Sequence, residues 1–173
     1  MADDFGDIAA ALDPALIIVT TAVDGERAGC LVGFHGQSSM EPERYCVWLS
    51  KANHTARVAQ RANHLCVQPV PEDALALAER FGTLTGDDTD KFAGLDLRQG
   101  PDGVPLLAAC PAGFVLRKHT LLDDGGDHLC ITGEVVDTWS AGPLRPLRLS
   151  RAGDLEPGHG NEERPLPPTE RAR

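Results

Sequence analysis

The stretch RYCVWLSKANHT, residues 44–55, decides how the chain is interpreted. Its first part, Arg44 to Leu49, is mostly apolar and predicts a strand, and residues 55–62 predict a helix. The start of a helix presents unpaired backbone N–H groups and a partial positive charge. Lys51 adds an ammonium group and Ser50 adds a hydroxyl donor. The stretch therefore predicts an anion-binding pocket between a strand and a helix.

This pocket has a plainer alternative, in which Asn53 or Thr55 simply caps the helix and Lys51 is a solvated turn residue. The charge of the chain bears on the choice. Lys and Arg total 16, Asp and Glu total 26, and the formal net charge is −10. Most of the surface would repel a phosphate, so a local pocket must attract it. The same charge argues against nucleic acid or an anionic membrane as the main partner.

The length of 173 residues suits one domain of ordinary size. No apolar run approaches the roughly 20 residues that cross a bilayer. Residues 8–12 are too short for the core of a signal peptide, and the aspartates before them have the wrong charge. We therefore expect a cytoplasmic protein that does not bind membranes.

The five cysteines are odd in number and contain no CxxC spacing, so we expect small buried thiols. No histidine pair has HxH or HExxH spacing, and no metal site is predicted. The motifs GxGxxG and GxSxG are both absent from the chain. A Rossmann dinucleotide site and serine hydrolysis are therefore poor hypotheses.

The periodicity of the chain predicts a mainly β domain with a few short helices. Six strands are expected at residues 15–22, 28–34, 44–49, 64–70, 112–122 and 128–139. Helices are expected at residues 5–12, 55–62 and 72–81, with a further helical turn at residues 88–93. The strands are joined mainly by short turns, which favours an antiparallel barrel over a doubly wound parallel sheet. We assign residues 1–142 to this domain. Residues 143–173, which hold six of the 13 prolines, are predicted to be a flexible tail.

Two further segments are candidates for a binding site. In residues 29–39, a predicted strand leads into a loop with Gly33 and Gly36, where the backbone could approach a flat heteroaromatic ligand and Phe34 or His35 could stack on it. The alternative is a plain β-bulge or loop. The second segment, residues 126–128, places His128 beside an aspartate at the start of a strand, where the carboxylate could hold the ring. Its alternative is a turn followed by a surface histidine.

Taken together, these segments resemble the flavin reductase family of FMN-binding split barrels, over roughly residues 8–140. Each motif is weak, but their order along the chain is fairly specific. The motifs are Ile18-Val19-Thr20-Thr21, Asp24-Gly25, the loop at 29–42, Ser50 to Thr55, Asp90-Lys91-Phe92, Gly103-Val104-Pro105-Leu106, Gly126-Asp127-His128 and Gly133-Glu134-Val135.

The resemblance implies a homodimeric six-stranded antiparallel split barrel that binds FMN or FAD and transfers hydride to it from NADH or NADPH. It also implies a possible monooxygenase partner, which would receive reduced flavin. His128 would help position the nicotinamide or flavin. The implied flavin contacts are Leu31, Val32, Gly33, Phe34, His35, Ser38 and Ser39 at the ring, then Ser50, Lys51, Ala52, Asn53, His54 and Thr55 at the phosphate, with Lys91, Phe92 and Asp127 nearby.

The loop departs from the family pattern. Leu31-Val32-Gly33-Phe34 stands where the family has Thr-Val-Ser-Ser, so hydroxyl contacts to the ring are lost while backbone contacts are still available. Two alternatives follow: a flavin carrier or sensor without reductase turnover, and a split-barrel oxidoreductase that uses a deazaflavin or haem-type ligand.

Overall fold

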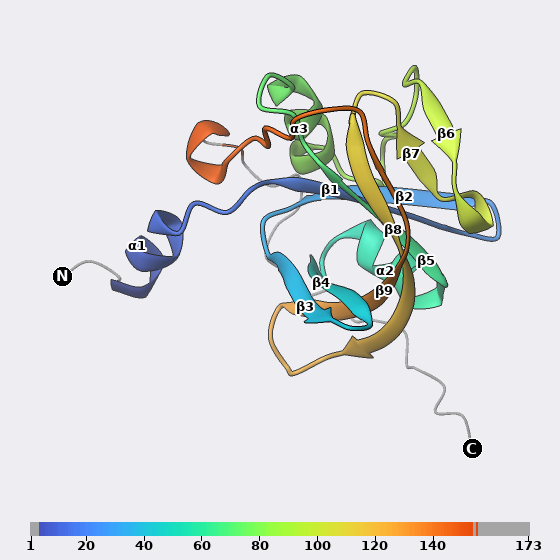
Figure 1. The fold of residues 1–173 in the computed structure, drawn as a ribbon, viewed down its shortest axis with the longest axis horizontal. Helices are drawn as coiled ribbons and strands as arrows, with labels where there is room; N and C mark the ends of the chain where they lie inside the picture. Colours follow the sequence, from blue (N-terminus) through green and yellow to red (C-terminus); the bar gives the residue numbers. More distant parts are fainter. Residues whose placement is uncertain (1–3, 154, 156–173) are drawn as a thin grey trace.

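The computed structural model describes residues 4–153 and 155, and its main feature is one antiparallel sheet of seven strands (Figure 1). Their order in the sheet is β2-β1-β5-β8-β9-β4-β3. Since β2 and β3 are the two edges of the sheet, the barrel is split between them. The strands are β1 Ile17–Val23, β2 Glu26–Val32, β3 His35–Met40, β4 Glu43–Ser50, β5 His64–Pro69, β8 Ala112–Leu122 and β9 His128–Ser140.

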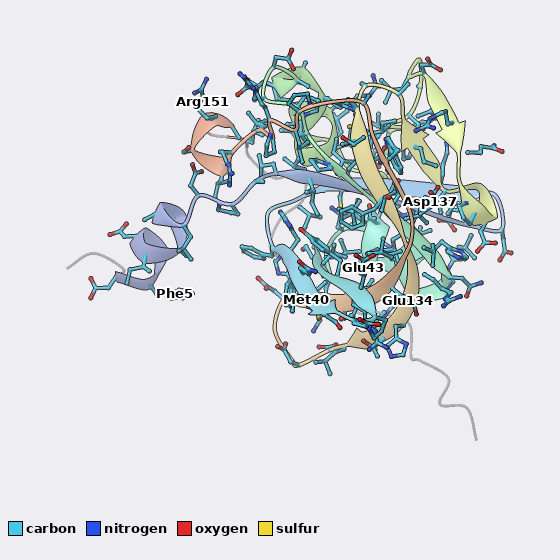
Figure 2. All side chains as sticks on the ribbon, viewed as in Figure 1. Phe5, Met40, Glu43, Glu134, Asp137 and Arg151 are labelled. Carbon is cyan, nitrogen blue, oxygen red and sulfur yellow. The ribbon has the colours of Figure 1, made fainter. Side chains whose placement is uncertain are left out.

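Short helices and a small hairpin surround this sheet. The helices are α1 Asp4–Ala11, α2 His54–Arg61 and α3 Leu75–Thr83, with 3-10 turns η1 Pro101–Gly103 and η2 Leu149–Arg151. Strands β6 Leu97–Gln99 and β7 Pro105–Leu107 form a separate two-stranded sheet. Helix α1 buries none of its residues, and Figure 2 shows Phe5 well away from the body. Within the described residues, no helix is long and apolar enough to cross a membrane.

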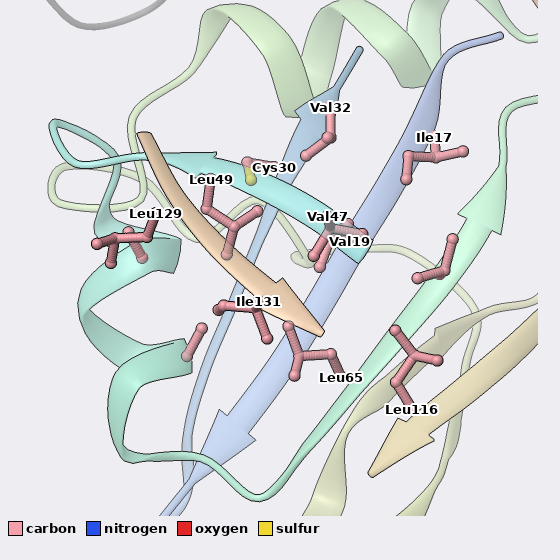
Figure 3. Packing of buried hydrophobic residues seen from close by; sticks show 13 residues of the cluster. Ile17, Val19, Cys30, Val32, Val47, Leu49, Leu65, Leu116, Leu129 and Ile131 are labelled. Carbon is pink, nitrogen blue, oxygen red and sulfur yellow. The ribbon is translucent and has the colours of Figure 1, made fainter. Parts of the chain in front are cut away.

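The core has two main parts, which follow from the alternation of the strands. Inside the barrel, side chains of β1, β4 and β9 such as Val19, Val47 and Ile131 meet with less than 1% exposure (Figure 3). On the other side of β1, Ile18 packs with Phe81 of α3 in a second cluster. Strand β1 is therefore buried on both faces, which explains why its sequence, IIVTTAV, contains no charged residue.

The mainly β class and all six predicted strands are confirmed, with small shifts of their ends. Three strands were missed: β3, β6 and β7. Strand β3 contains Gly36, Gln37 and two serines, which have little strand propensity, but its backbone pairs with β4 through His35↔Val47 and Gly36↔Cys46. The prediction of a helical turn at residues 88–93 is wrong, because these residues form only isolated turns. Helix α3 begins at Leu75, three residues later than expected.

Part of the predicted tail packs against the domain. Leu147 is 3% exposed, and its backbone N–H donates to Val70 while its carbonyl accepts from Leu16. Isolated bridges join Ala15 to Arg148 and Pro71 to Pro146. The described part of residues 143–155 is thus attached to the body, and the rest of the predicted tail lies outside the described residues.

Candidate functional site

A cavity of about 410 Å³ lies at the split of the barrel. The chain leaves β2 at Val32, crosses through Gly33 and Phe34, and enters β3, so this crossing forms one wall. The Phe34 carbonyl accepts a hydrogen bond of 2.9 Å from the Trp48 N–H, which fixes the crossing to β4. The connection from β4 to α2 and the start of β9 also line the cavity.

One end of the cavity is polar and carries a cation. The Lys51 side chain is only 11% exposed, and its ammonium group lies 2.8 Å from a carboxylate oxygen of Asp123. Its backbone N–H donates to the Asp127 carbonyl at 2.9 Å. The Lys51 ammonium, as the leading cause, lowers the pKa of Asp123. Lys51 is therefore held in place at the cavity wall and is not a solvated turn residue.

The beginning of α2 confirms the capping alternative for Asn53. Its side chain accepts a hydrogen bond of 3.0 Å from the Thr55 N–H. Capping and ligand binding are compatible here, because Ser50, Ala52 and Asn53 themselves line the cavity. The capping bond fixes the turn that presents these residues.

The start of β9 adds an aromatic pair beside this polar end. The ring of His128 lies next to Phe34, with centroids 5.1 Å apart and planes tilted by 56°. The Asp127 carboxylate and the Nδ1 atom of His128 are 2.6 Å apart. This hydrogen bond, followed by the charge of the ring, lowers the pKa of Asp127. The carboxylate therefore stays ionised at neutral pH and orients the imidazole.

The other end of the cavity is apolar. Leu16, just before β1, lines it together with Leu31 of β2 and Phe81 of α3, and Leu149 and Ala152 close it from the C-terminal segment. The cavity thus has a polar, hydrogen-bonding end, where Lys51 lies with the carboxylates of Asp123 and Asp127, and an apolar end. Such a site suits a flat ligand with an anionic group at one side.

Gly33 leaves room where a ligand could approach the backbone. Its backbone is outside the left-handed region, and an added Cβ would meet only Leu16 Cδ2, at 3.8 Å. Neither backbone strain nor crowding within the chain requires glycine at this position. Close approach of a ligand ring to the backbone is a physical reason for it.

The cavity brings together most of the predicted site. The predicted residues that line it are Leu31, Val32, Gly33, Phe34, Ser50, Lys51, Ala52, Asn53, Asp127 and His128. The predicted residues outside it are His35, Ser38, Ser39, His54, Thr55, Lys91 and Phe92.

His35 and the two serines belong to β3 rather than to the loop expected there. The His35 ring is held between the Tyr45 hydroxyl at 2.7 Å and the Ala15 carbonyl at 2.6 Å. Ser38 and Ser39 lie at a bulge in this edge strand. The loop is shorter than predicted because backbone pairing with β4 begins at His35.

The start of α2 turns two other predicted residues away from the cavity. His54 lies 3.3 Å from both Glu26 and Asp87, in an ionic cluster on the other side of the helix start. Thr55 is 1% exposed and lies beside the Cys30 thiol inside the barrel.

Lys91 and Phe92 have structural partners. The Lys91 ammonium group is almost fully buried and donates to the carbonyls of Gly29 and Phe81 at 3.0 and 3.1 Å. Burial, as the leading cause, lowers the pKa of Lys91. Phe92 packs edge-on against Phe81 in the second core cluster. Both residues fix the end of α3, which carries Phe81 into the cavity wall.

Sequence reasoning missed several lining residues. Trp48 had a usable signal, because it alternates with the buried Val47 and Leu49 and so faces outward. Phe81 is the last residue of the helix expected at residues 72–81 and was not among the predicted site residues. Leu149 and Ala152 fell in the predicted tail, where no periodicity marks a cavity wall.

Comparison with known proteins gives a consistent result. The family described as "Flavin reductase like domain" matches residues 12–152. The reductase subunit HsaB of a flavin-dependent monooxygenase from Rhodococcus jostii is 30% identical over 134 residues, covering 78% of this chain and 67% of that protein. A ferric-chelate reductase (NAD(P)H) from Archaeoglobus fulgidus is 28% identical and covers 70% of this chain and 73% of its own length.

Solved structures agree on the fold. The flavin reductase HpaC complexed with NADP+ superposes with a TM-score of 0.73 at 21% identity, covering 87% of this chain and 99% of that chain. An FMN-binding protein from Thermus thermophilus gives a TM-score of 0.71 at 24% identity, covering 78% of this chain and 77% of that chain. At these identities, the superpositions support the split-barrel fold.

Proposed function

The chain belongs to the flavin reductase like domain family, and from this premise we propose that it is an NAD(P)H-dependent flavin oxidoreductase with FMN as its flavin and FAD as the alternative. The observation that carries the proposal is the two-ended cavity at the split of the barrel. Its polar end offers Lys51 and Ser50, and its other end is apolar. A cytoplasmic location remains our prediction from the sequence.

The residues present fit FMN. A phosphate needs a cation and hydrogen-bond donors, which Lys51, Ser50 and the capped start of α2 supply. The isoalloxazine ring needs a flat apolar slot with backbone groups along one edge, which the Gly33 crossing and the apolar end supply. The cavity volume of about 410 Å³ lies in the range of small-molecule sites, roughly 300–1,000 Å³.

Bound flavin supplies an acceptor for the electrons of a reduced nicotinamide. The chain's own residues bind and orient the two ring systems. Phe34 and His128 form an aromatic surface at the cavity on which a second ring can lie. Asp127 holds the imidazole through the 2.6 Å contact to Nδ1. The apolar walls exclude water, so that hydrogen bonds from the backbone near Gly33 act on the ligand at low dielectric.

A homodimer is part of the proposal, and the outer face of β3, β4, β9 and β8 is the surface we assign to it. Val47, Leu49, Leu129 and Ile131 point into the barrel, so their neighbours point outward. Beyond the charged pair Arg44 and Glu134 at one end of this face, the outward residues named here are uncharged, although the chain has a net charge of −10. They are Phe34, Cys46, Trp48, Thr120, Leu122, Cys130 and Thr132.

This uncharged face is continuous with the cavity. Phe34 and Trp48 line the cavity, and Leu122 pairs with Cys130 farther along the sheet. Phe34 is 60% exposed and Leu122 is 59% exposed. A second copy packed here would cover both residues and the open side of the cavity. Leu122→Glu is expected to convert the dimer to a monomer in analytical ultracentrifugation. A dimer that is unchanged by Leu122→Glu would show that this face is not the interface.

A separate monooxygenase is the partner that we propose for the reduced flavin. HsaB is described as the reductase subunit of a flavin-dependent monooxygenase. The reductase subunit of stachydrine N-demethylase from Rhizobium meliloti is 28% identical over 148 residues, and this chain covers 61% of its length. The oxygenase that accepts flavin from this chain can be sought by coupled oxidation assays.

The phosphate assignment can be tested by comparing FMN with riboflavin, which lacks the phosphate. Lys51→Met is expected to raise the Kd for FMN by about tenfold or more, as for loss of a charge-assisted hydrogen bond, and to change the Kd for riboflavin little. Arg117→Met, which removes an exposed charge outside the cavity, is the control. Equal losses for both ligands, or no loss for FMN, would overturn the assignment.

A further inference from the structure

The C-terminal segment, residues 145–153, crosses one end of the molecule as a strap. Its turn η2 lies beside the chain that joins α1 to β1 (Figure 1). Backbone hydrogen bonds attach it on both sides. On one side, Leu16 donates to the Leu147 carbonyl at 2.8 Å and Leu149 donates to the Pro14 carbonyl at 3.0 Å. On the other side, Leu147 donates to the Val70 carbonyl at 2.7 Å. The strap has a fixed position relative to β1.

Asp13 fastens the turn of the strap. One carboxylate oxygen accepts from the Ser150 N–H at 2.7 Å, and the other accepts from the Ser150 hydroxyl at 2.8 Å. These bonds, with the backbone bond as the larger cause, lower the pKa of Asp13. Asp13 itself has a φ of 44°, a conformation that aspartate tolerates better than most residues.

The strap forms part of the cavity wall, and its contribution is apolar. Leu149, Ala152 and Gly153 line the cavity from the strap, close to Leu16 and Phe81 of the second core cluster. Ala152 is 5% exposed, but Leu149 is 42% exposed although it faces the cavity. The chain itself therefore leaves Leu149 partly uncovered at this point. A ligand in the cavity would cover it.

The cavity's polarity indicates which part of a ligand meets this wall. Lys51 and Ser50 lie at the polar end, together with Asp127 and His128, whereas the strap residues belong to the apolar end with Leu16 and Phe81. A ligand with its anionic group beside Lys51 would place an apolar edge toward the strap.

We propose that the strap is the wall that receives the apolar edge of the ligand's ring, and that Asp13 is the positioning residue that holds this wall in place. The inference rests on the proposed function and assigns the described part of the C-terminal segment to ligand retention. The ligand class is a planar heteroaromatic ring. The strap contacts the ring and leaves the phosphate to Lys51.

The wall can be tested with two ligands, FMN and lumichrome, which has the ring system but no ribityl phosphate. Leu149→Asn keeps the side chain's size and makes it polar. It is expected to raise the Kd for both ligands by a similar factor, about three- to tenfold, because apolar contact with the ring is lost. Leu144→Asn is the matched control, since Leu144 is 49% exposed and lies outside the cavity.

The positioning role has its own variant. Asp13→Gly retains the positive φ and removes both acceptors for Ser150. It is expected to speed FMN dissociation in stopped-flow fluorescence while leaving the circular dichroism spectrum unchanged. Asp24→Gly, at a φ of 50° in the exposed β1–β2 turn, controls for the flexibility of an added glycine. A faster dissociation in both glycine variants, or in neither, would overturn the role of Asp13.

The two ligands separate this inference from the function on which it rests. If the unmodified protein binds neither FMN nor lumichrome, the proposed function fails. If the unmodified protein binds both and Leu149→Asn binds them equally well, the proposed function stands and the strap is not the ring wall. A loss confined to FMN would place the strap at the phosphate and also overturn the inference.

Discussion

Replacing Gly33 by alanine should change folding stability and FMN affinity in opposite directions. Gly33 lies in the crossing from β2 to β3 and lines the cavity. Its φ is outside the left-handed region, and an alanine Cβ would meet only Leu16 Cδ2 at 3.8 Å, an ordinary van der Waals contact. Among the described residues, nothing opposes the added methyl group, whereas a ligand ring packed on this backbone would.

Gly33→Ala should raise the stability of the free protein and lower its affinity for FMN. A glycine replaced by alanine at a compatible position stabilises the fold by about 0.4–1 kcal/mol, mainly through the unfolded chain. For a chain of this size, that raises the Tm of the free protein by about 1–4 °C. A methyl group pressed into a packed contact costs about 1–3 kcal/mol, which corresponds to an increase in the Kd for FMN of about 5- to 150-fold.

Thermal unfolding without ligand and fluorescence titration with FMN measure the two effects separately. Gly36→Ala is the matched control, because an added Cβ there meets nothing within 4 Å and Gly36 does not line the cavity. It should leave the Kd for FMN unchanged. If Gly33→Ala bound FMN as tightly as the unmodified protein, the ring would not lie against this crossing. If Gly33→Ala unfolded at a lower Tm than the unmodified protein, the conclusion that the fold accepts an alanine at position 33 would be wrong.

Three other predictions concern the site and the fold. His128→Ala should lower the kcat for NADH oxidation more than it weakens FMN binding, and an unchanged kcat would make the histidine a surface residue. Gln68→Ala should lower the free energy of unfolding by about 1–3 kcal/mol in urea titrations, because the buried Leu107 N–H loses its 2.6 Å acceptor. Asp123→Asn should cost stability at pH 7 but not in strong acid. The pKa of Asp123 is lowered from 3.8 by Lys51, so its contribution is complete above 3.8 and is lost as pH falls through the folded value. An equal cost at both pH values would contradict this pairing.

The sequence predicted the elements whose pattern is set by burial. Ile17 to Val23 contains no charged residue because β1 is covered on both faces. Strands β4 and β9 were found because one of their faces is buried, which gives alternating apolar residues. Strand β3 was missed because backbone pairing with β4, rather than its side chains, makes it a strand. Such pairing depends on the position of a distant strand, which no local pattern records.

The site divides in the same way. The segments around Lys51 and His128 were recognised because each carries its chemistry in a few consecutive residues, and the register Ser50↔His128 brings them together. The register of this antiparallel pair places β9 beside β4 although almost 80 residues separate them in the chain. His54 was misplaced because successive side chains at a helix start point about 100° apart, and His54 lies beside Glu26 and Asp87 rather than at the cavity. The strap was missed because its contacts are with Asp13 and Leu16, at the opposite end of the sequence.

The reductase assignment is best tested by anaerobic absorbance spectroscopy of the purified protein, first with FMN and then with NADH or NADPH. We expect a flavin spectrum that shifts on binding and bleaches when reduced nicotinamide is added, with bleaching slowed in His128→Ala. A bound flavin that stays oxidised with both nicotinamides would contradict the reductase and favour a flavin carrier or sensor. A protein that shows no flavin signal at all would contradict the assignment of the cavity at the split of the barrel.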